Sequence, residues 1–185
     1  MWQHPQLGMP SKMDGQLRPP FEQLSALLLL DRLARFRSQP ASLLDIGCGT
    51  GHLLRLALRF FPGTPMIGVD PAPWLLPEAA ANARHARFLH GMPHALPLPP
   101  ACVDVATCRQ RVPSDRWELD LDEARRVLAP GGLLGLAGVA TPSPGHLVAY
   151  GFAVADTQFL PATADEPGIS VVIARTVGYP PRSVL

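Results

Sequence analysis

The sequence predicts a doubly wound α/β fold, in which a mostly parallel sheet of about seven strands includes an antiparallel strand at the carboxyl terminus. Three observations support this prediction. Short apolar runs alternate with amphipathic helical segments through the first five expected strands. The run at 43–46 leads directly into a glycine-rich turn. The last two expected strands are separated by a polar, proline-containing turn, which favours an antiparallel pair.

Hydrophobic periodicity and the positions of proline and glycine locate each element. Helices are expected at 20–37, 51–61, 77–84, 115–128 and 146–150. Strands are expected at 43–46, 65–70, 87–90, 102–107, 133–140, 152–159 and 169–176. Pro130, Gly131 and Gly132 are expected to end the fourth helix, because proline lacks an amide donor and glycine favours a left-handed backbone. The strand after them is apolar throughout, as a strand covered on both faces must be.

The 185 residues are enough for a single domain with a substantial core. We expect that domain to span 20–185. A flexible arm is expected at 1–19, where prolines, glycines and polar residues show no periodicity. The arm is interpreted either as a terminus without a role or as a lid over a ligand.

Composition argues against several classes of function. A net charge of +1 gives no electrostatic case for binding nucleic acid or an anionic membrane. The three cysteines, Cys48, Cys102 and Cys108, lack metal-ligand spacing, so we expect no metal, no disulfide framework and a reducing, cytoplasmic setting. The apolar run Leu24–Leu30 is far shorter than the roughly 20 residues of a membrane span. The first residues also lack the regions of a signal peptide.

The turn after the first strand carries the clearest chemical signal. Gly47, Gly49 and Gly51 allow the backbone to bend sharply and to approach a ligand. The dinucleotide fingerprint needs a glycine where this chain has His52, and the Gly-Lys-Ser or Gly-Lys-Thr of a phosphate-binding loop is absent. Asp70 is expected to end the neighbouring strand, where its carboxylate can accept hydrogen bonds from both hydroxyls of a ribose. The ligand is therefore expected to contain a ribose without requiring a pyrophosphate.

Four segments in a fixed order carry a resemblance to a known family. They are LDIGCGTG at 44–51, GVDP at 68–71, FLHGMPHALPLPPACVDV at 88–105 and EARRVLAPGG at 123–132. With them the chain resembles the class I S-adenosylmethionine-dependent methyltransferases, and among these the small-molecule, methyltransferase type 11-like group. The resemblance implies a Rossmann-like sheet, S-adenosyl-L-methionine as cofactor and a small-molecule substrate.

The resemblance also implies how the cofactor is held. The methionine part is expected against Asp45 and the glycine turn, the ribose hydroxyls on Asp70, and the adenine between the segment after Asp70 and the loop of Met92. The implied cofactor-binding residues are Asp45, Gly47, Cys48, Gly49, Gly51, Asp70, Pro71, Trp74, Leu75, Met92, Pro93 and Cys108. Related proteins often have a polar residue where this chain has Met92, so adenine recognition is expected to fall partly on backbone groups.

Methyl transfer from an activated sulfonium depends mainly on alignment, and a base is needed only for an acceptor that is protonated at neutral pH. His94 is the candidate base, and His52 is expected to face solvent. Arg109 and Arg111 follow the fourth strand, where they can hold an acidic acceptor or lie on the surface as solvated arginines. Asp104 is interpreted as structural.

Two main hypotheses for function stay open. The leading one is methyl transfer to a small molecule. The alternative is a catalytically weak or inactive methyltransferase-like domain that binds the cofactor or a partner. Met92 favours the alternative, as does the spacing of only about a dozen residues between the fifth and sixth strands, which leaves no room for a lid. A homodimer is one way to complete such a site. A nicotinamide oxidoreductase is a third, more distant hypothesis, which His52 opposes.

Overall fold

The computed structural model describes residues 18–110, 117–139, 141–162 and 168–177. Its helices are α1 Arg18–Phe36, α2 His52–Phe60, the 3-10 helix η2 Pro73–Leu75, α3 Leu76–Asn82, α4 Trp117–Val127 and α5 Pro144–Ala149. Its strands are β1 Leu43–Ile46, β2 Met66–Asp70, β3 Ala86–His90, β4 Val103–Gln110, β5 Leu128–Gly138, β6 Phe152–Leu160 and β7 Ile169–Thr176.

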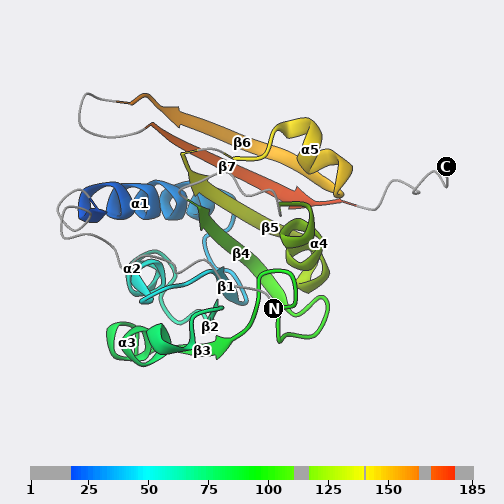
Figure 1. Cartoon of the computed structure of the whole chain (residues 1–185). Helices are drawn as coiled ribbons and strands as arrows, with labels where there is room; N and C mark the ends of the chain where they lie inside the picture. Colours follow the sequence, from blue (N-terminus) through cyan, green and yellow to red (C-terminus); the bar gives the residue numbers. More distant parts are fainter. Residues whose placement is uncertain (1–17, 111–116, 140, 163–167, 178–185) are drawn as a thin grey trace, which may run out of the picture.

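In the described part of the chain, seven strands form one sheet in the order β3-β2-β1-β4-β5-β7-β6 (Figure 1). Strand β1 pairs in parallel with β2 and β4, and the parallel set continues to β3 on one side and to β5 on the other. Strand β7 is antiparallel to both β5 and β6. The predicted doubly wound sheet with an antiparallel C-terminal strand is therefore confirmed. Strand order reverses between β1 and β4, and ligands bind at such a switch point in open α/β sheets.

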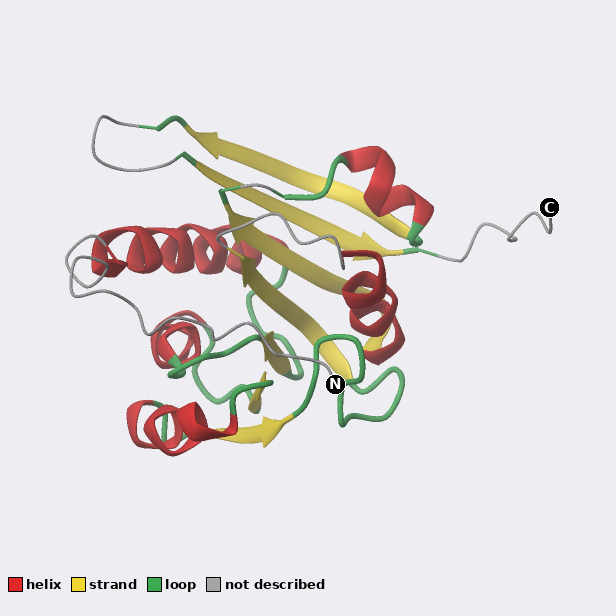
Figure 2. Ribbon diagram, in the orientation of Figure 1, coloured by secondary structure: helices red, strands yellow, loops and turns green. Residues whose placement is uncertain are grey.

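Helices cover both faces of the sheet (Figure 2). Helices α1 and α2 pack on one face, over an apolar cluster that includes Leu29, Leu43 and Leu54. Helices α4 and α5 lie on the other face, over a second cluster that includes Leu44, Leu121 and Leu147. The two neighbours Leu43 and Leu44 belong to different clusters because successive side chains of a strand point to opposite faces. Burial on both faces explains why the central strands are almost wholly apolar.

Most element boundaries lie within two residues of those expected, and β7 occupies the expected residues. The fourth helix ends at Val127, one residue before the expected end, but the expected start of the fifth strand at 133 is wrong, because β5 begins at Leu128. Leu128 already pairs with β4, and a Cβ at Gly132 would lie only 2.8 Å from a backbone carbonyl oxygen. Pairing with β4 thus extends the strand through the segment that the sequence suggested as a helix stop. Strand β4 is also longer than expected and runs to Gln110.

The arm expected at 1–19 lies almost entirely outside the described residues, and α1 already begins at Arg18. Within the described ranges, no helix is long and apolar enough to cross a membrane.

Asp104 joins three segments at the amino end of the central strands. Its Oδ1 accepts a hydrogen bond from Arg37, and its Oδ2 accepts one from the Ala41 N–H at 3.0 Å. Arg37 also donates to the carbonyl oxygen of Gly131 at 3.1 Å. The loop before β1, the start of β4 and the start of β5 are thus held by one charged pair, which agrees with the structural role expected for Asp104.

We predict that Asp104→Ala lowers the free energy of unfolding by about 1–3 kcal/mol, because it leaves the half-buried Arg37 guanidinium without its carboxylate. Urea titration followed by circular dichroism measures the change. Glu78→Ala, at an exposed position of α3, serves as the control and is expected to change stability by less than about 0.5 kcal/mol. Equal effects of the two substitutions would contradict a structural role for Asp104.

Candidate functional site

The glycine turn between β1 and α2, Gly47–Gly51, forms a cradle at the carboxyl end of the central strands. Gly47, Gly49 and Gly51 have φ angles of 73°, 52° and 76°, a left-handed conformation that residues with side chains rarely adopt. A Cβ added at Gly47 or Gly49 would meet nothing within 4 Å, whereas one at Gly51 would lie 3.1 Å from the carbonyl oxygen of Ala79. The first two glycines therefore border open space, and the third allows α2 and α3 to approach closely.

Asp70 fastens the glycine cradle to the end of β2. Its Oδ2 accepts a hydrogen bond from the Gly49 N–H at 2.7 Å, and its Oδ1 accepts one from the Ala72 N–H at 2.8 Å. The residue is buried, with 6% of its surface exposed. Each carboxylate oxygen can accept two hydrogen bonds, so Asp70 keeps acceptor capacity after binding both amides.

Asp45 lies on β1 directly before the cradle and is almost fully buried. Its Oδ1 accepts a hydrogen bond from the Thr107 hydroxyl at 2.8 Å, whereas its Oδ2 is buried and has no hydrogen-bond partner among the described residues. Burial raises the pKa of Asp45 to about 6, the Arg109 guanidinium and the Thr107 hydroxyl oppose this rise, and Asp70 adds to it. Sequence analysis missed Thr107. The two-residue alternation of β4, which puts Thr107 and Arg109 on one face, is the signal that indicates it.

Arg109 lies near Asp45, and His52 lies near Arg109. Nη1 of Arg109 donates to the carbonyl oxygen of Glu22 in α1 at 3.1 Å. His52 begins α2, and its Nδ1 lies 3.2 Å from a guanidinium nitrogen of Arg55. Burial lowers the pKa of His52, with Arg109 and Arg55 acting in the same direction and Glu22 opposing them. His52 was expected to face solvent, but the residue is half-buried, with its Nδ1 side exposed and its Nε2 buried.

Cys48 and Cys108 contribute to the interior. Cys48 packs against Gly68, where an added Cβ would lie 2.8 Å from the sulfur. Burial raises the pKa of the Cys48 thiol above its ordinary value, and Asp45 and Asp70 act in the same direction. Cys108 is buried within the apolar cluster beneath α4 and α5. Both thiols are therefore packing groups, and a ligand in the cradle would meet these residues through their backbone.

Apolar side chains are exposed just after the carboxyl ends of β2 and β3. Trp74 in η2 is 76% exposed, and Met92 is 39% exposed. The Gly91 N–H donates to the carbonyl oxygen of Asp70 at 3.2 Å, which holds the loop of Met92 next to the end of β2. Of the other residues predicted for this region, Pro71 is exposed, whereas Leu75 and Pro93 are half-buried.

His94 lies in a loop that is anchored on α4. Glu123 accepts the Leu96 N–H at 2.8 Å, and Arg126 donates to the carbonyl oxygens of Leu96 and Leu98. Hydrogen bonds from Arg126 hold the pKa of Glu123 below its ordinary value against the effect of burial, and the nearby His94 acts in the same direction as Arg126. His94 thus lies close to α4. The second predicted arginine of the acceptor side, Arg111, lies outside the described residues.

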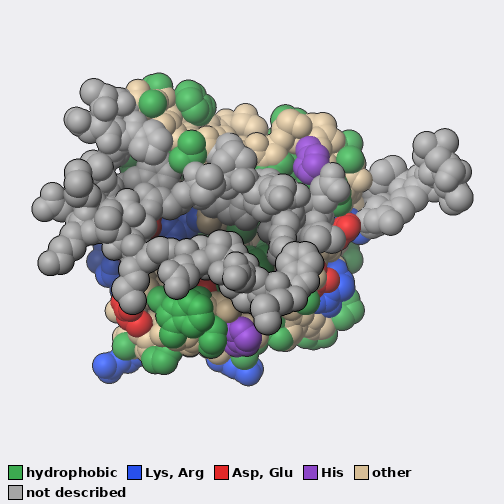
Figure 3. Space-filling model, in the orientation of Figure 1, with side chains coloured by type: hydrophobic (Ala, Val, Ile, Leu, Met, Phe, Trp, Pro, Cys, Tyr) green, Lys and Arg blue, Asp and Glu red, His purple; other side chains and the backbone are tan. Residues whose placement is uncertain are grey.

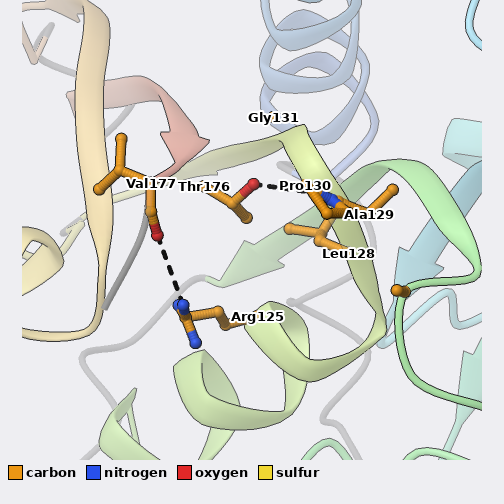
Figure 4. Close-up of a pocket in the computed structure, with 8 residues that line it drawn as sticks. Arg125, Leu128, Ala129, Pro130, Gly131, Thr176 and Val177 are labelled. Carbon is orange, nitrogen blue, oxygen red and sulfur yellow. Dashed lines mark hydrogen bonds between the residues drawn. The ribbon is translucent and has the colours of Figure 1, made fainter.

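A separate pocket opens at the opposite end of the strands, where β5 begins (Figure 4). It is lined by Ala101, Arg125, Leu128, Ala129, Pro130, Gly131, Thr176 and Val177. Within it Thr176 donates to the carbonyl oxygen of Ala129 at 3.1 Å, and Arg125 donates to that of Val177 at 3.4 Å. Because it lies where β5 begins and β7 ends, this pocket is remote from the glycine cradle and belongs to a different part of the molecule.

On the face shown in Figure 3, the described residues mix hydrophobic, acidic and basic side chains, without a continuous basic patch in that view. In the part of the chain that the structure describes, no group of three or more His, Cys, Asp or Glu side chains is arranged to hold a metal ion.

The sheet order and the cradle define a Rossmann-like domain of the kind that binds nucleoside-containing cofactors. A family model described as "Methyltransferase domain" matches residues 43–132, which include the cradle, Asp70 and the Met92 loop. The demethylmenaquinone methyltransferase of Thermus thermophilus is 33% identical over 137 residues, covering 66% of this chain and 62% of that protein. The chain is similar to the class I S-adenosylmethionine-dependent methyltransferases. It spans less than two thirds of that relative's length.

Solved structures with the same fold include proteins of different activity. The 1,6-didemethyltoxoflavin-N1-methyltransferase of Burkholderia thailandensis, solved with 1,6-didemethyltoxoflavin and S-adenosylhomocysteine, has a TM-score of 0.69 and 21% identity over 90% of this chain and 84% of that one. The [4+2]-cyclase SpnF also has a TM-score of 0.69 and 21% identity, over 89% of this chain and 86% of that one. At this identity the likeness shows the fold, and the fold alone does not fix the reaction.

The buried carboxyl of Asp45 predicts a specific dependence of stability on pH. The folded state holds the Asp45 proton more tightly than the unfolded state, whose pKa is near 3.8, so Asp45 makes the protein less stable as pH rises from about 4 to about 6. We predict that the free energy of unfolding of Asp45→Asn, relative to the wild type, increases over this range by up to about 3 kcal/mol and then levels off.

Urea unfolding at several pH values tests this prediction. Asp31→Asn removes a carboxylate from the exposed Asp31–Arg35 pair of α1 and serves as the control for loss of one negative charge. A difference between Asp45→Asn and the wild type that stays constant from pH 4 to pH 7 would show that the Asp45 carboxyl is not destabilised by burial.

Proposed function

We propose that this protein transfers the methyl group of S-adenosyl-L-methionine to a small-molecule acceptor by in-line displacement. The observation that carries the proposal is the glycine cradle with two buried acids, Asp45 and Asp70, at the ends of neighbouring strands. The match to a methyltransferase-domain family model supports it, because the matched segment contains all three features. The activity is a proposal for the whole protein, since the chain covers only part of its relatives' length.

The proposed binding mode follows the carboxyl edge of the sheet. The methionine part lies along Gly47, Cys48, Gly49 and Gly51, where the absence of Cβ atoms at the glycines leaves open space beside the backbone. Asp70 accepts hydrogen bonds from the ribose hydroxyls with the acceptor capacity that its two amide contacts leave. Asp45 faces the positively charged methionine part of the cofactor.

The adenine ring lies between the two exposed apolar segments that follow β2 and β3. Trp74 and Met92 supply apolar surface, and the Gly91–Asp70 hydrogen bond holds the two segments at a fixed spacing. Pro71, Leu75 and Pro93 complete this border, and Cys108 contributes its backbone at the end of β4. A flat aromatic ring gains stabilisation from such surfaces through burial of apolar area.

The sulfonium of the cofactor supplies an activated methyl group. The protein's part is to hold the acceptor in line with the methyl–sulfur bond and to exclude water, which accounts for much of the barrier reduction in such displacements. The nucleophilic atom of the acceptor forms the new bond to carbon as the carbon–sulfur bond breaks. His94 takes a proton only if the acceptor is protonated at neutral pH, and an acceptor with a free lone pair needs no base.

The alternative function is a binding module that holds the cofactor without methyl transfer. The [4+2]-cyclase shares this fold and is named for another reaction, so the fold by itself does not imply methyl transfer. The short β5–β6 connection, which contains only α5, also leaves the acceptor side without an internal lid among the described residues. A second subunit is one way to close the site, so a homodimer is part of the proposal.

We predict that the wild type binds S-adenosylmethionine and S-adenosylhomocysteine, and that Asp70→Asn weakens both by about 10- to 100-fold, because hydrogen bonds to a charged group are worth about 1.5–3 kcal/mol. Calorimetric titration and thermal stabilisation measure the two affinities. Asp31→Asn on the exposed face of α1 is the matched control and should bind as the wild type does. Absence of both heat and stabilisation at millimolar ligand would overturn the proposed function.

Formation of S-adenosylhomocysteine in the presence of an acceptor panel separates the two hypotheses. The panel should include quinols, carboxylates, phenols and amines, since the reaction releases the same product whichever atom is methylated. We expect at least one acceptor to raise product formation above the rate with cofactor alone. Tight cofactor binding without any such acceptor would favour the binding module.

A further inference from the structure

Three buried side-chain atoms without a hydrogen-bond partner among the described residues lie at one end of the sheet. They are Oδ2 of Asp45, Nε of Arg109 and Nε2 of His52. Buried polar atoms in native proteins are almost always paired, so each unpaired atom calls for an explanation. Three such atoms near the glycine cradle indicate a site where a polar ligand supplies the missing hydrogen-bond partners.

Strand alternation places the side chains of Asp45 and Arg109 on the same face of the sheet. Asp45 pairs with Thr107 across β1 and β4, and the Thr107 hydroxyl bonds to Asp45. Arg109 is two residues beyond Thr107 on the same strand, so its side chain leaves the sheet on the same face. The hydrogen bond from Arg109 to Glu22 in α1 agrees with this placement, because α1 covers that face.

The Asp45 carboxylate and the Arg109 guanidinium are near enough to interact but are not bonded through their buried atoms. The guanidinium opposes the burial-driven rise in the pKa of Asp45, which requires proximity. Yet Oδ2 of Asp45 and Nε of Arg109 both lack a hydrogen-bond partner in the described part of the chain, so these two atoms do not bond to each other. A carboxylate and a guanidinium cation that lie near each other without a bond between these two atoms match a ligand that carries both charges. The ligand's cationic group would face Asp45 and its anionic group would face Arg109.

We propose that Arg109 holds the α-carboxylate of the cofactor's methionine part while Asp45 receives its α-ammonium. This inference rests on the proposed function, and it assigns Arg109 to the methyl donor rather than to an acidic acceptor. The neighbours of the guanidinium favour the donor: they are Asp45 and His52, which flank the glycine cradle on either side. Arg109 is a positioning residue, since it acts on the end of the donor that does not react.

The test compares three ligands that share the methylated sulfur and the adenosine. S-adenosylmethionine carries both the carboxylate and the ammonium, and decarboxylated S-adenosylmethionine lacks only the carboxylate. 5′-Methylthioadenosine lacks both groups and the sulfonium charge, so it reports binding of the adenosine part alone. Calorimetric titration of each ligand into the wild type, Arg109→Gln and Arg109→Lys gives the affinities. Arg59→Gln, on the exposed side of α2, is the control arginine variant. Circular dichroism and the unfolding midpoint verify that each variant is folded.

We expect the wild type to prefer S-adenosylmethionine to its decarboxylated form by about 10- to 100-fold, as for one charge-assisted hydrogen-bonded pair. Arg109→Gln should lose most of this preference while its affinity for 5′-methylthioadenosine stays within about twofold of the wild type. Arg109→Lys should restore part of the preference, because it keeps the charge without the planar fork. Arg59→Gln should behave as the wild type.

Two results would overturn the assignment of Arg109. One is an equal loss of affinity for all three ligands in a folded Arg109→Gln variant, which would mean that Arg109 supports the cradle through Glu22 alone. The other is an unchanged preference, which would return Arg109 to the acceptor side. Failure of the wild type to bind any of the three ligands would instead overturn the proposed function, so the two failures are distinguishable.

Discussion

The site depends on one carboxylate, that of Asp70, which holds two backbone amides at the end of β2. Its contacts with Gly49 and Ala72 tie the glycine cradle to the segment that leads into η2. The Gly47 and Cys48 amides also donate to the carbonyl oxygen of Val69 in β2, and the two charge-assisted hydrogen bonds of Asp70 add the link from the cradle to the next loop. The same residue receives the Gly91 amide on its carbonyl oxygen, so three loops meet at Asp70.

The second constraint is electrostatic. Asp45 is buried, its Oδ2 has no hydrogen-bond partner among the described residues, and the nearby Arg109 only partly offsets the effect of burial on its pKa. A buried charge without a full set of hydrogen bonds destabilises the folded state, and proteins retain such groups where function requires them. In the proposed function, the ligand's ammonium would donate the hydrogen bond that Oδ2 of Asp45 lacks. Cofactor binding and folding stability would then be linked through the same side chain.

Local patterns in the sequence predicted the sheet, the cradle and Asp70. Glycines at 47, 49 and 51 require no tertiary information, because their left-handed backbone follows from the turn itself. The expected start of β5 was wrong because Leu128 already pairs with β4, which a helix-stop signal does not reveal. The Asp45–Thr107 bond and the position of His52 also escaped prediction. The Asp45–Thr107 bond joins residues far apart in the chain, so strand register determines it. The burial of His52 depends on how the helices pack, which local sequence does not reveal.

The role of Asp70 is tested most directly by a crystal structure of the protein with S-adenosylhomocysteine. We expect the Asp70 oxygens to lie within about 2.5–3.2 Å of the ribose hydroxyls while they still accept hydrogen bonds from the Gly49 and Ala72 amides. We also expect the adenine to lie between Trp74 and Met92. A ribose bound away from Asp70, or a cradle released from Asp70 when the ligand binds, would contradict this role of Asp70.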